Sequence, residues 1–234
     1  MTITLTRLLL GAWMAAAATV AHADSPAQLR EGEGSIESKL HVPNGLEPGR
    51  YDVYCEARVI ENGTARNFVC YSPDGSSPWM LVDAIRKAGR LARFVPATRN
   101  GKPAQVYMVL MVRTVIAENS EPLVLVLPNN GVEHARLGLF YIAPQRFNEF
   151  TWRWVKYHLP HVRSNKEPNA TLIWQELWID ELGNIRDSKL TNASDAPQEI
   201  VDTIRRSVDN MQFMPGRVDG KPVAMRYVEP AYSY

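Results

Sequence analysis

An eleven-residue phrase occurs twice in this chain and constrains its fold more than any other feature. Residues 94–104 read FVPATRNGKPA and residues 213–223 read FMPGRVDGKPV, at an offset of 119 residues. Phe, Pro, Gly, Lys and Pro recur in the same order. The phrase holds no nucleophile, metal-ligand set or acid–base pair, so it predicts a structural role. Recurrence at a fixed offset indicates an internal repeat.

Similar elements precede each copy of the phrase. In residues 51–116, alternating apolar residues flank an Asn-Gly turn, an amphipathic helix follows, and a β-rich run comes after the phrase. Residues 171–234 repeat this order, with a turn at Gly183-Asn184 and a helical stripe through Ile200 and Ile204. We therefore predict an α+β fold of two tandem β-β-α-β modules. Each is a small antiparallel sheet with one helix packed on one face.

The phrase is interpreted as the joint between the helix and the last strand of each module. Phe ends the helix on its apolar face, and the first Pro stops the helix. Asn-Gly or Asp-Gly takes a left-handed turn, and the second Pro opens the last strand. The connector residues are Phe94, Pro96, Gly101, Lys102 and Pro103 in the first copy, and Phe213, Pro215, Gly220, Lys221 and Pro222 in the second.

The remaining segments differ in character. Residues 24–50 form a polar lead-in, and residues 117–170 form a linker with an extra strand at PLVLVLP. Its aromatic segment, 137–158, fits both a helical stripe and strand alternation, so its conformation stays open. The aromatic cluster is expected to form a core between the modules; the alternative is a platform for a sugar or peptide.

Residues 1–23 have the form of a signal peptide. A single Arg precedes an apolar run over residues 8–20, and AHA-DS offers a small-x-small site, which predicts cleavage between Ala23 and Asp24. The protein is therefore expected in the periplasm. The alternative is an uncleaved anchor in the inner membrane that faces the periplasm, although the run is shorter than the roughly 20 residues that span a bilayer.

Charge excludes one class of partner. The chain has 26 basic and 25 acidic residues. Removing residues 1–23 takes away Arg7 and no acidic residue, which leaves a formal charge of zero. This balance argues against nucleic acid as a partner.

The two cysteines are expected to form a disulfide. Cys55 and Cys70 flank the turn signal Asn62-Gly63, and a turn centred there places them directly opposite each other. In an exported protein this arrangement predicts a disulfide. The alternative is two buried free thiols.

The second unit resembles the TonB C-terminal domain family of periplasmic energy transducers. The matching parts are IDELGNI, TNASDAPQEIVDTIRRSVDNMQFMPGRVDGKPV and AMRYVEPAYSY, over about residues 171–234. The first unit matches more weakly, through IENGTARN, its helix and ARFVPATRNGKPAQVYM. Family transducers also carry a membrane helix and a long Pro-rich spacer, which this sequence lacks, so the resemblance supports fold and binding mode more than force transduction.

The resemblance implies a non-enzymatic binding or adaptor protein that engages an envelope partner by strand addition. The partner is expected to be an envelope protein or an outer-membrane receptor peptide, within TonB-dependent transport. One alternative is a membrane-anchored energy transducer. Another is an envelope structural protein that binds peptidoglycan.

The last strand of each module is expected to be the binding edge, since an edge leaves backbone N–H and C=O groups unpaired. The alternative is that these edges pair with each other or with the linker strand, and self-association through them is a further expectation. The expected edge residues are Ala224, Met225, Arg226, Tyr227 and Val228 in the second unit, and Gln105, Tyr107, Val109 and Met111 in the first.

No catalytic, cofactor-binding or metal-binding set is predicted. His158 and His161 are separated by Pro160, which argues against a helical metal site. The sequence contains neither a Gly-rich phosphate loop nor a G-x-S-x-G elbow.

Overall fold

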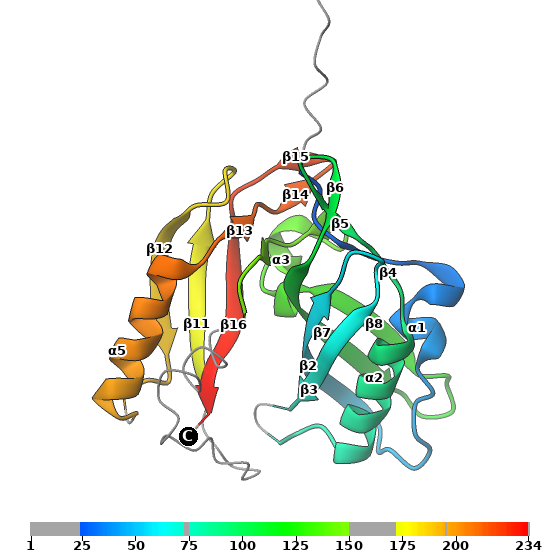
Figure 1. The fold of residues 1–234 in the computed structure, drawn as a ribbon. Coiled ribbons are helices and arrows are strands. Elements are labelled where there is room, and N and C mark those ends of the chain that lie inside the picture. The colour runs from blue at the N-terminus through cyan, green and yellow to red at the C-terminus, as the bar shows by residue number, and fades with distance from the viewer. Residues whose placement is uncertain (1–23, 73–74, 150–171, 195, 234) are drawn as a thin grey trace, which may run out of the picture.

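The computed structural model describes residues 24–72, 75–149, 172–194 and 196–233. This part of the chain is a mixed α+β structure, with mostly antiparallel strands in several small sheets and few helices. Figure 1 shows two principal sheets side by side, with α5 beside one and α1 and α2 beside the other.

The larger sheet, called the N-terminal sheet, has the order β13-β10-β7-β2-β3, and β8 also pairs with β7. The smaller sheet, called the C-terminal sheet, has the order β12-β11-β16. In the N-terminal sheet the strands are β2 (Gly49–Val59), β3 (Ala65–Tyr71), β7 (Val106–Ile116), β8 (Leu123–Pro128), β10 (Gln145–Arg146) and β13 (Phe213–Met214). In the C-terminal sheet they are β11 (Leu172–Ile179), β12 (Ile185–Thr191) and β16 (Met225–Ser233).

Short strands and helices complete the structure. The short strands are β1 (Gln28–Leu29), β4 (Phe94–Val95), β5 (Ala97–Arg99), β6 (Lys102–Ala104), β9 (Tyr141–Ile142), β14 (Arg217–Val218) and β15 (Lys221–Pro222). The α-helices are α1 (Ile36–Lys39), α2 (Trp79–Leu91), α3 (His134–Leu137) and α5 (Gln198–Ser207). The 3-10 turns are η1 (Gly32–Gly34), η2 (Asn129–Gly131) and η3 (Val208–Asn210).

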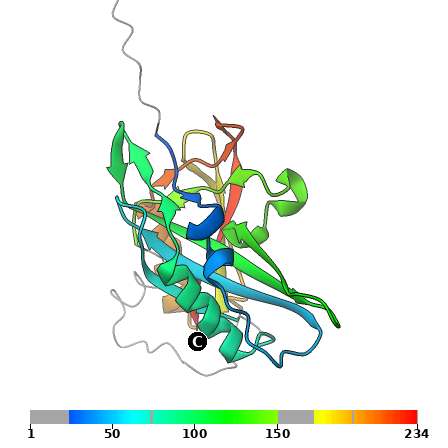
Figure 2. The ribbon, with the colours of Figure 1, turned by 90° about the vertical axis from the view of Figure 1, so that its right-hand side faces the viewer.

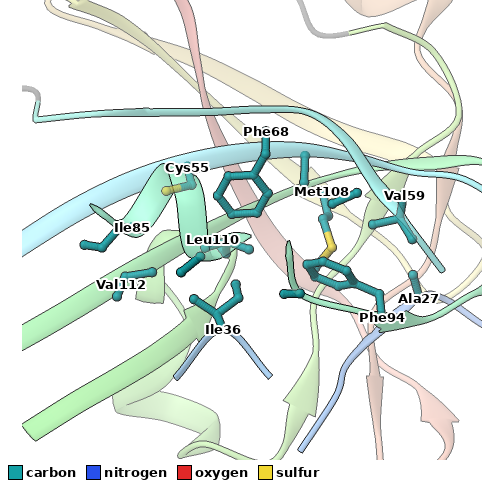
Figure 3. Packing of buried hydrophobic residues seen from close by; sticks show 14 of the residues in the cluster. Ala27, Ile36, Cys55, Val59, Phe68, Ile85, Phe94, Met108, Leu110 and Val112 are labelled. Atoms are coloured by element: carbon teal, nitrogen blue, oxygen red, sulfur yellow. The ribbon is translucent and has the colours of Figure 1, made fainter. Parts of the chain in front are cut away.

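The main core lies between the N-terminal sheet and its helices. Figure 2 shows α2 lying across the strands, and Figure 3 shows Ile85 of α2 packed with Phe68, Leu110 and Ile36. Ile36 belongs to the lead-in, which the sequence marks only as polar. Its few apolar residues enter this core, so the lead-in is a packed part of the structure.

The first hairpin pairs the two cysteines as predicted, but its turn has a different centre and one strand contains a bulge. Val59 lies opposite Ala65, which centres the turn on Asn62, one half-residue from the predicted centre. A β-bulge then adds one residue to β3 at Asn67, whose φ is 52°, and this restores the register. Without the bulge, Cys55 would lie opposite Val69.

Cys55 and Cys70 form the predicted disulfide. Their Cα atoms are 4.1 Å apart, which is close to the spacing of a non-hydrogen-bonded pair. The alternative of free thiols is therefore wrong.

Replacing both cysteines with Ala should lower the free energy of unfolding by about 3 kcal/mol, because the bond closes a loop of 15 residues. Urea unfolding of the oxidised protein and of the double variant measures the difference. A thiol titration of the unfolded wild-type protein is the control, and two titratable thiols would contradict the pairing.

The repeated phrase forms a small hairpin in each copy rather than leading directly into the last strand. β5 pairs with β6, and β14 pairs with β15. Asn100, Gly101, Asp219 and Gly220 all have positive φ, which confirms the predicted left-handed turns. The interpretation that the second Pro opens the last strand is wrong, because Pro103 lies in β6, and Pro222 lies likewise in β15.

Pro96 also does not stop the first helix. The helix ends at Leu91, where Ala92 turns to an extended conformation with ψ 159°. The N–H of Phe94 then donates to the carbonyl of Gly63 in the hairpin turn, at 2.9 Å. The helix has therefore ended, and Phe94 is already hydrogen-bonded to the turn, before the chain reaches Pro96.

β7 is not an edge strand, so the predicted edge of the first unit is wrong. Beyond its pairing with β2, β7 pairs with β8 from Leu110 to Val115, and Tyr107 pairs with Arg146 of β10. The physical reason is that residues 106–112, VYMVLMV, are apolar without interruption and all buried, so both faces of the strand are covered, as is typical of a central strand. The alternative, pairing with the linker strand, is the observed one.

The site residues expected on β7 lie as follows. Tyr107 and Val109 point to the C-terminal part of the chain and share an apolar cluster with Phe213, Tyr227 and Leu177. Met111 lies opposite Leu127 of β8, while Gln105 precedes β7. Tyr107 and Val109 thus pack the N-terminal sheet against the C-terminal sheet.

Two findings concern the membrane and the aromatic segment. In the part of the chain that the structure describes, no helix is long and apolar enough to cross a membrane. Residues 150–158 of the aromatic segment, Ala23 of the predicted cleavage site, and His161 lie outside the described residues.

Candidate functional site: the outer edge of the last strand

The last strand, β16, pairs with β11 along one side, and its other side faces the segment that follows β8. Figure 1 shows α3 of this segment between β16 and the N-terminal sheet. The backbone N–H and C=O groups of Arg226 and Val228 point to this second side. We call this side the outer edge of β16.

Three side chains satisfy the outer edge. Asn129 Nδ2 donates to the Arg226 carbonyl, and the Val228 N–H donates to Asn129 Oδ1 at 3.0 Å. Asn130 Nδ2 donates to the Val228 carbonyl at 2.9 Å, and the Arg226 N–H donates to Glu133 Oε1 at 2.9 Å. All four outward backbone groups of the two residues therefore have a partner. We call Asn129, Asn130 and Glu133 the edge cover.

The amide of Asn129 takes the place of a strand residue. It donates to the carbonyl at position 226 and accepts from the N–H at position 228. A residue of a neighbouring parallel strand makes the same two bonds across position 227. The edge thus receives β-type hydrogen bonds from side chains instead of from a backbone.

The backbone of η2 directs these side chains toward β16. Asn129, Asn130 and Gly131 have φ values of 49°, 55° and 72°, three left-handed residues in succession. Asn tolerates this conformation better than other residues with a side chain, and Gly tolerates it without cost. The sequence NNG therefore allows a turn tight enough to bring two buried amides to the edge.

Glu133 places a buried carboxylate between two arginines. Its side chain is 1% exposed, and Oε2 accepts from Arg136 Nε at 2.5 Å. Arg226 Nε lies 3.3 Å from Oε1, in addition to the backbone bond from the same residue. Arg226 also lies 3.6 Å from Glu176 of β11. Glu133 therefore joins the cover to β16 by charge as well as by hydrogen bonds.

The ends of the outer edge are also closed. Arg136 Nη2 donates to the Ala224 carbonyl at 3.0 Å. Alternation along the strand places Pro230 at the next outward position after Val228, and Pro has no N–H to offer a new strand. The expectation of free backbone groups on this edge is therefore wrong, because side chains distant in sequence occupy them. The role of residues 224–228 in partner binding stays a prediction.

Of the predicted residues, Arg226 and Val228 present both backbone groups to the outer edge, and Ala224 presents its carbonyl. Tyr227 and Met225 lie opposite Leu177 and Ile179, and their side chains are buried. By the alternation of a β-ladder, their backbone groups point to β11.

A buried ion pair lies beside the site. Arg146 Nη1 donates to Glu229 Oε1 at 2.6 Å, and both side chains are 0% exposed. Tyr227 donates to Glu229 Oε2 at 3.1 Å, and burial together with the Glu229 charge raises the pKa of Tyr227 well above its ordinary value. Arg146 belongs to β10 of the N-terminal sheet, so the pair joins the two principal sheets.

The other sheet edges differ from β16. β12 lies at the end of the C-terminal sheet and carries exposed charges at Arg186, Asp187 and Lys189. Charged side chains on an edge oppose pairing with another chain. β3 forms the end of the N-terminal sheet, and its bulge at Asn67 interrupts a regular ladder.

A groove of about 550 Å³ lies apart from the outer edge, where β8 and β10 diverge along β7. Leu125, Leu139 and Phe140 line one part of it, and the lead-in lines another. The amide of Gln145 holds the lead-in there by two bonds to the backbone of Ala27, at 2.7 and 2.6 Å. This contact explains why the lead-in is fixed against the sheet.

Sequence reasoning missed the edge cover. The run PNNG signals a turn, but no local pattern relates Asn129 to a strand 97 residues away. The burial of Glu133 could not be predicted either, since its partners come from β16 and from its own helical turn. Only the pairing of distant segments reveals these roles.

Among the described residues, no group of three or more His, Cys, Asp or Glu could hold a metal ion. The expectation that the protein is not an enzyme stays a prediction. Comparison with known proteins found no matching family model, no matching curated protein and no matching solved structure.

Proposed function

We propose that this chain is a non-enzymatic binding or adaptor protein of the periplasm, built from two tandem β-β-α-β modules of the TonB C-terminal type. It engages an extended segment of an envelope protein by strand addition on the outer edge of β16. The order β3-β2-β7 in one sheet and β12-β11-β16 in the other supports the tandem arrangement. The disulfide supports an exported protein.

One observation carries the binding mode. The outward N–H and C=O groups of Arg226 and Val228 already receive four β-type hydrogen bonds from side chains within the chain. An extended peptide offers the same donors and acceptors from its backbone, at regular spacing. The edge is therefore able to accept a strand once the side chains leave.

Val228→Pro tests this function. The substitution removes an N–H that points outward, whereas Pro at Tyr227 would break the pairing with β11. We expect the variant to lose capture of its partner from an envelope extract by at least about tenfold, since it loses one hydrogen bond of any added strand and gains a steric conflict.

Val228→Ala is the matched control, because it shortens the same side chain and keeps the N–H. It should capture the partner as the wild-type protein does. Equal capture by the Pro and Ala variants would overturn strand addition on this edge. Unfolding temperatures of both variants establish that the comparison is made on folded protein.

A further inference from the structure

We propose that the outer edge of β16 is a site for an extended segment that carries an acidic side chain, and that the edge cover is its intramolecular competitor. This inference rests on the proposed function and names the chemistry and the regulation of the same site. Three observations carry it: the completeness of the cover, its imperfection as a ligand, and the charge that it leaves behind.

The cover occupies all four outward backbone groups of Arg226 and Val228. Each outward group of Arg226 and Val228 is bonded to a side chain of residues 129–133. A peptide cannot add to β16 while these bonds persist, because both would use the same N–H and C=O groups. Binding of a partner and closure of the cover are therefore mutually exclusive.

The cover is nevertheless a poor substitute for a strand. Asn130 is 6% exposed, and within the described ranges its Oδ1 atom is buried without a hydrogen-bond partner. An unsatisfied buried carbonyl disfavours the closed arrangement. Two of the covering residues, Asn129 and Asn130, also stand in the left-handed region. A regular strand would satisfy the edge without either cost.

Charge then selects the occupant. When the cover leaves, Glu133 and Arg136 leave on the same short segment, while Arg226 stays on β16. Arg226 loses the carboxylate that contacts both its N–H and its guanidinium, and keeps Glu176 at 3.6 Å. An incoming segment with Asp or Glu beside Arg226 restores this contact. A Lys at the same place would face Arg226 as a like charge.

The test uses a variant with a weakened cover and defined peptides. Asn129→Ala combined with Asn130→Ala removes three of the four bonds to the edge and leaves Glu133 and the charge of the protein unchanged. The probes are two short synthetic peptides of alternating Val and Thr, one with a central Glu and one with a central Lys. Fluorescence anisotropy of the labelled peptides measures their affinity for the full exported chain.

The Glu peptide should bind the double variant on the order of tenfold more tightly than it binds the wild-type protein. The reason is that the apparent affinity equals the intrinsic affinity multiplied by the fraction of molecules in which the outer edge is uncovered. It should also bind the variant more tightly than the Lys peptide does. Adding Val228→Pro to the double variant should abolish the gain. Hydrogen exchange should show faster exchange at Val228 in the variant, and unchanged exchange at Tyr227.

Several outcomes overturn the inference. Equal affinity of the Glu peptide for both proteins shows that the cover does not compete, and equal affinity of the two peptides removes the acidic preference. If the double variant binds neither peptide and instead dimerises in sedimentation analysis, the cover serves to prevent pairing between copies. Asn130→Ala alone repeats the measurement with one bond removed, should the double variant not fold.

The failure of this inference is distinguishable from failure of the proposed function. Capture of the envelope partner that is abolished by Val228→Pro, yet unchanged by the Asn double variant, keeps strand addition and overturns the competitor. Capture that is unchanged by Val228→Pro overturns both the proposed function and the inference about the competitor.

Discussion

Replacing the turn glycine of the β2–β3 hairpin or of the β11–β12 hairpin with Ala is expected to destabilise the protein by about 2 to 5 kcal/mol. Its Tm should fall by roughly 10 °C. The positions are Gly63 and Gly183, with φ values of 76° and 84°. A Cβ at Gly63 would lie 2.1 Å from the carbonyl oxygen of Phe94, and one at Gly183 would lie 2.3 Å from that of Phe213.

Two costs add at these positions. A left-handed φ costs a residue with a Cβ roughly 1–2 kcal/mol. The clash is with backbone rather than with a flexible side chain, so relief requires the connector to move away from the turn. In the first copy that movement would also break the bond from the Phe94 N–H to the Gly63 carbonyl. Urea and thermal unfolding of the disulfide-bonded protein measure the effect.

Gly220→Ala is the matched control. Gly220 lies in the repeated phrase and has φ 74°, but nothing lies within 4 Å of the position a Cβ would take. This variant should therefore show the conformational cost alone, about 1–2 kcal/mol. Equal losses for Gly183→Ala and Gly220→Ala would contradict the packing of the connector on the turn.

Arg146→Met is expected to cost about 3 to 5 kcal/mol, because it leaves the buried Glu229 carboxylate without its guanidinium partner. Arg146→Met combined with Glu229→Leu should cost clearly less, since the replacement of a buried ion pair by apolar side chains removes both charges together. The pair joins β10 to β16, so the loss should appear as weaker attachment of the two principal sheets.

Urea unfolding of the two single variants and the double variant gives the coupling between the residues. Arg205→Met is the control for the exposed case: Arg205 lies 3.8 Å from Asp202, and both side chains are more than half exposed. Its expected effect is within about 0.5 kcal/mol. A double variant as unstable as Arg146→Met alone would contradict the assignment of the cost to an uncompensated charge.

Much of the local structure could be predicted from the sequence, because its causes are local. The Asn-Gly and Asp-Gly turns, the helical stripe through Ile200 and Ile204, and the extra strand at PLVLVLP all follow from backbone preference and periodicity. The disulfide followed as well, although the prediction assumed a regular ladder and the structure needs the bulge at Asn67 to achieve the register.

The candidate site could not be predicted in the same way. Three of the four predicted edge residues of the first unit lie in β7, which has neighbours on both sides. In the second unit, the amides of a distant turn occupy the outward groups of Arg226 and Val228. The alternation of a strand specifies which of its residues face a core, but it does not specify which other strand pairs with it. The choice of neighbour depends on segments far apart in sequence.

The sequence by itself determined that this chain contains a repeated order of elements, two left-handed connector turns and one disulfide, since each depends on short-range geometry. Only the tertiary structure decided which strand edges are closed, that Glu229 and Arg146 meet out of contact with water, and that three side chains take the place of a strand beside β16. Backbone groups at a buried edge must find partners wherever the fold brings them, and for β16 these partners lie nearly a hundred residues away.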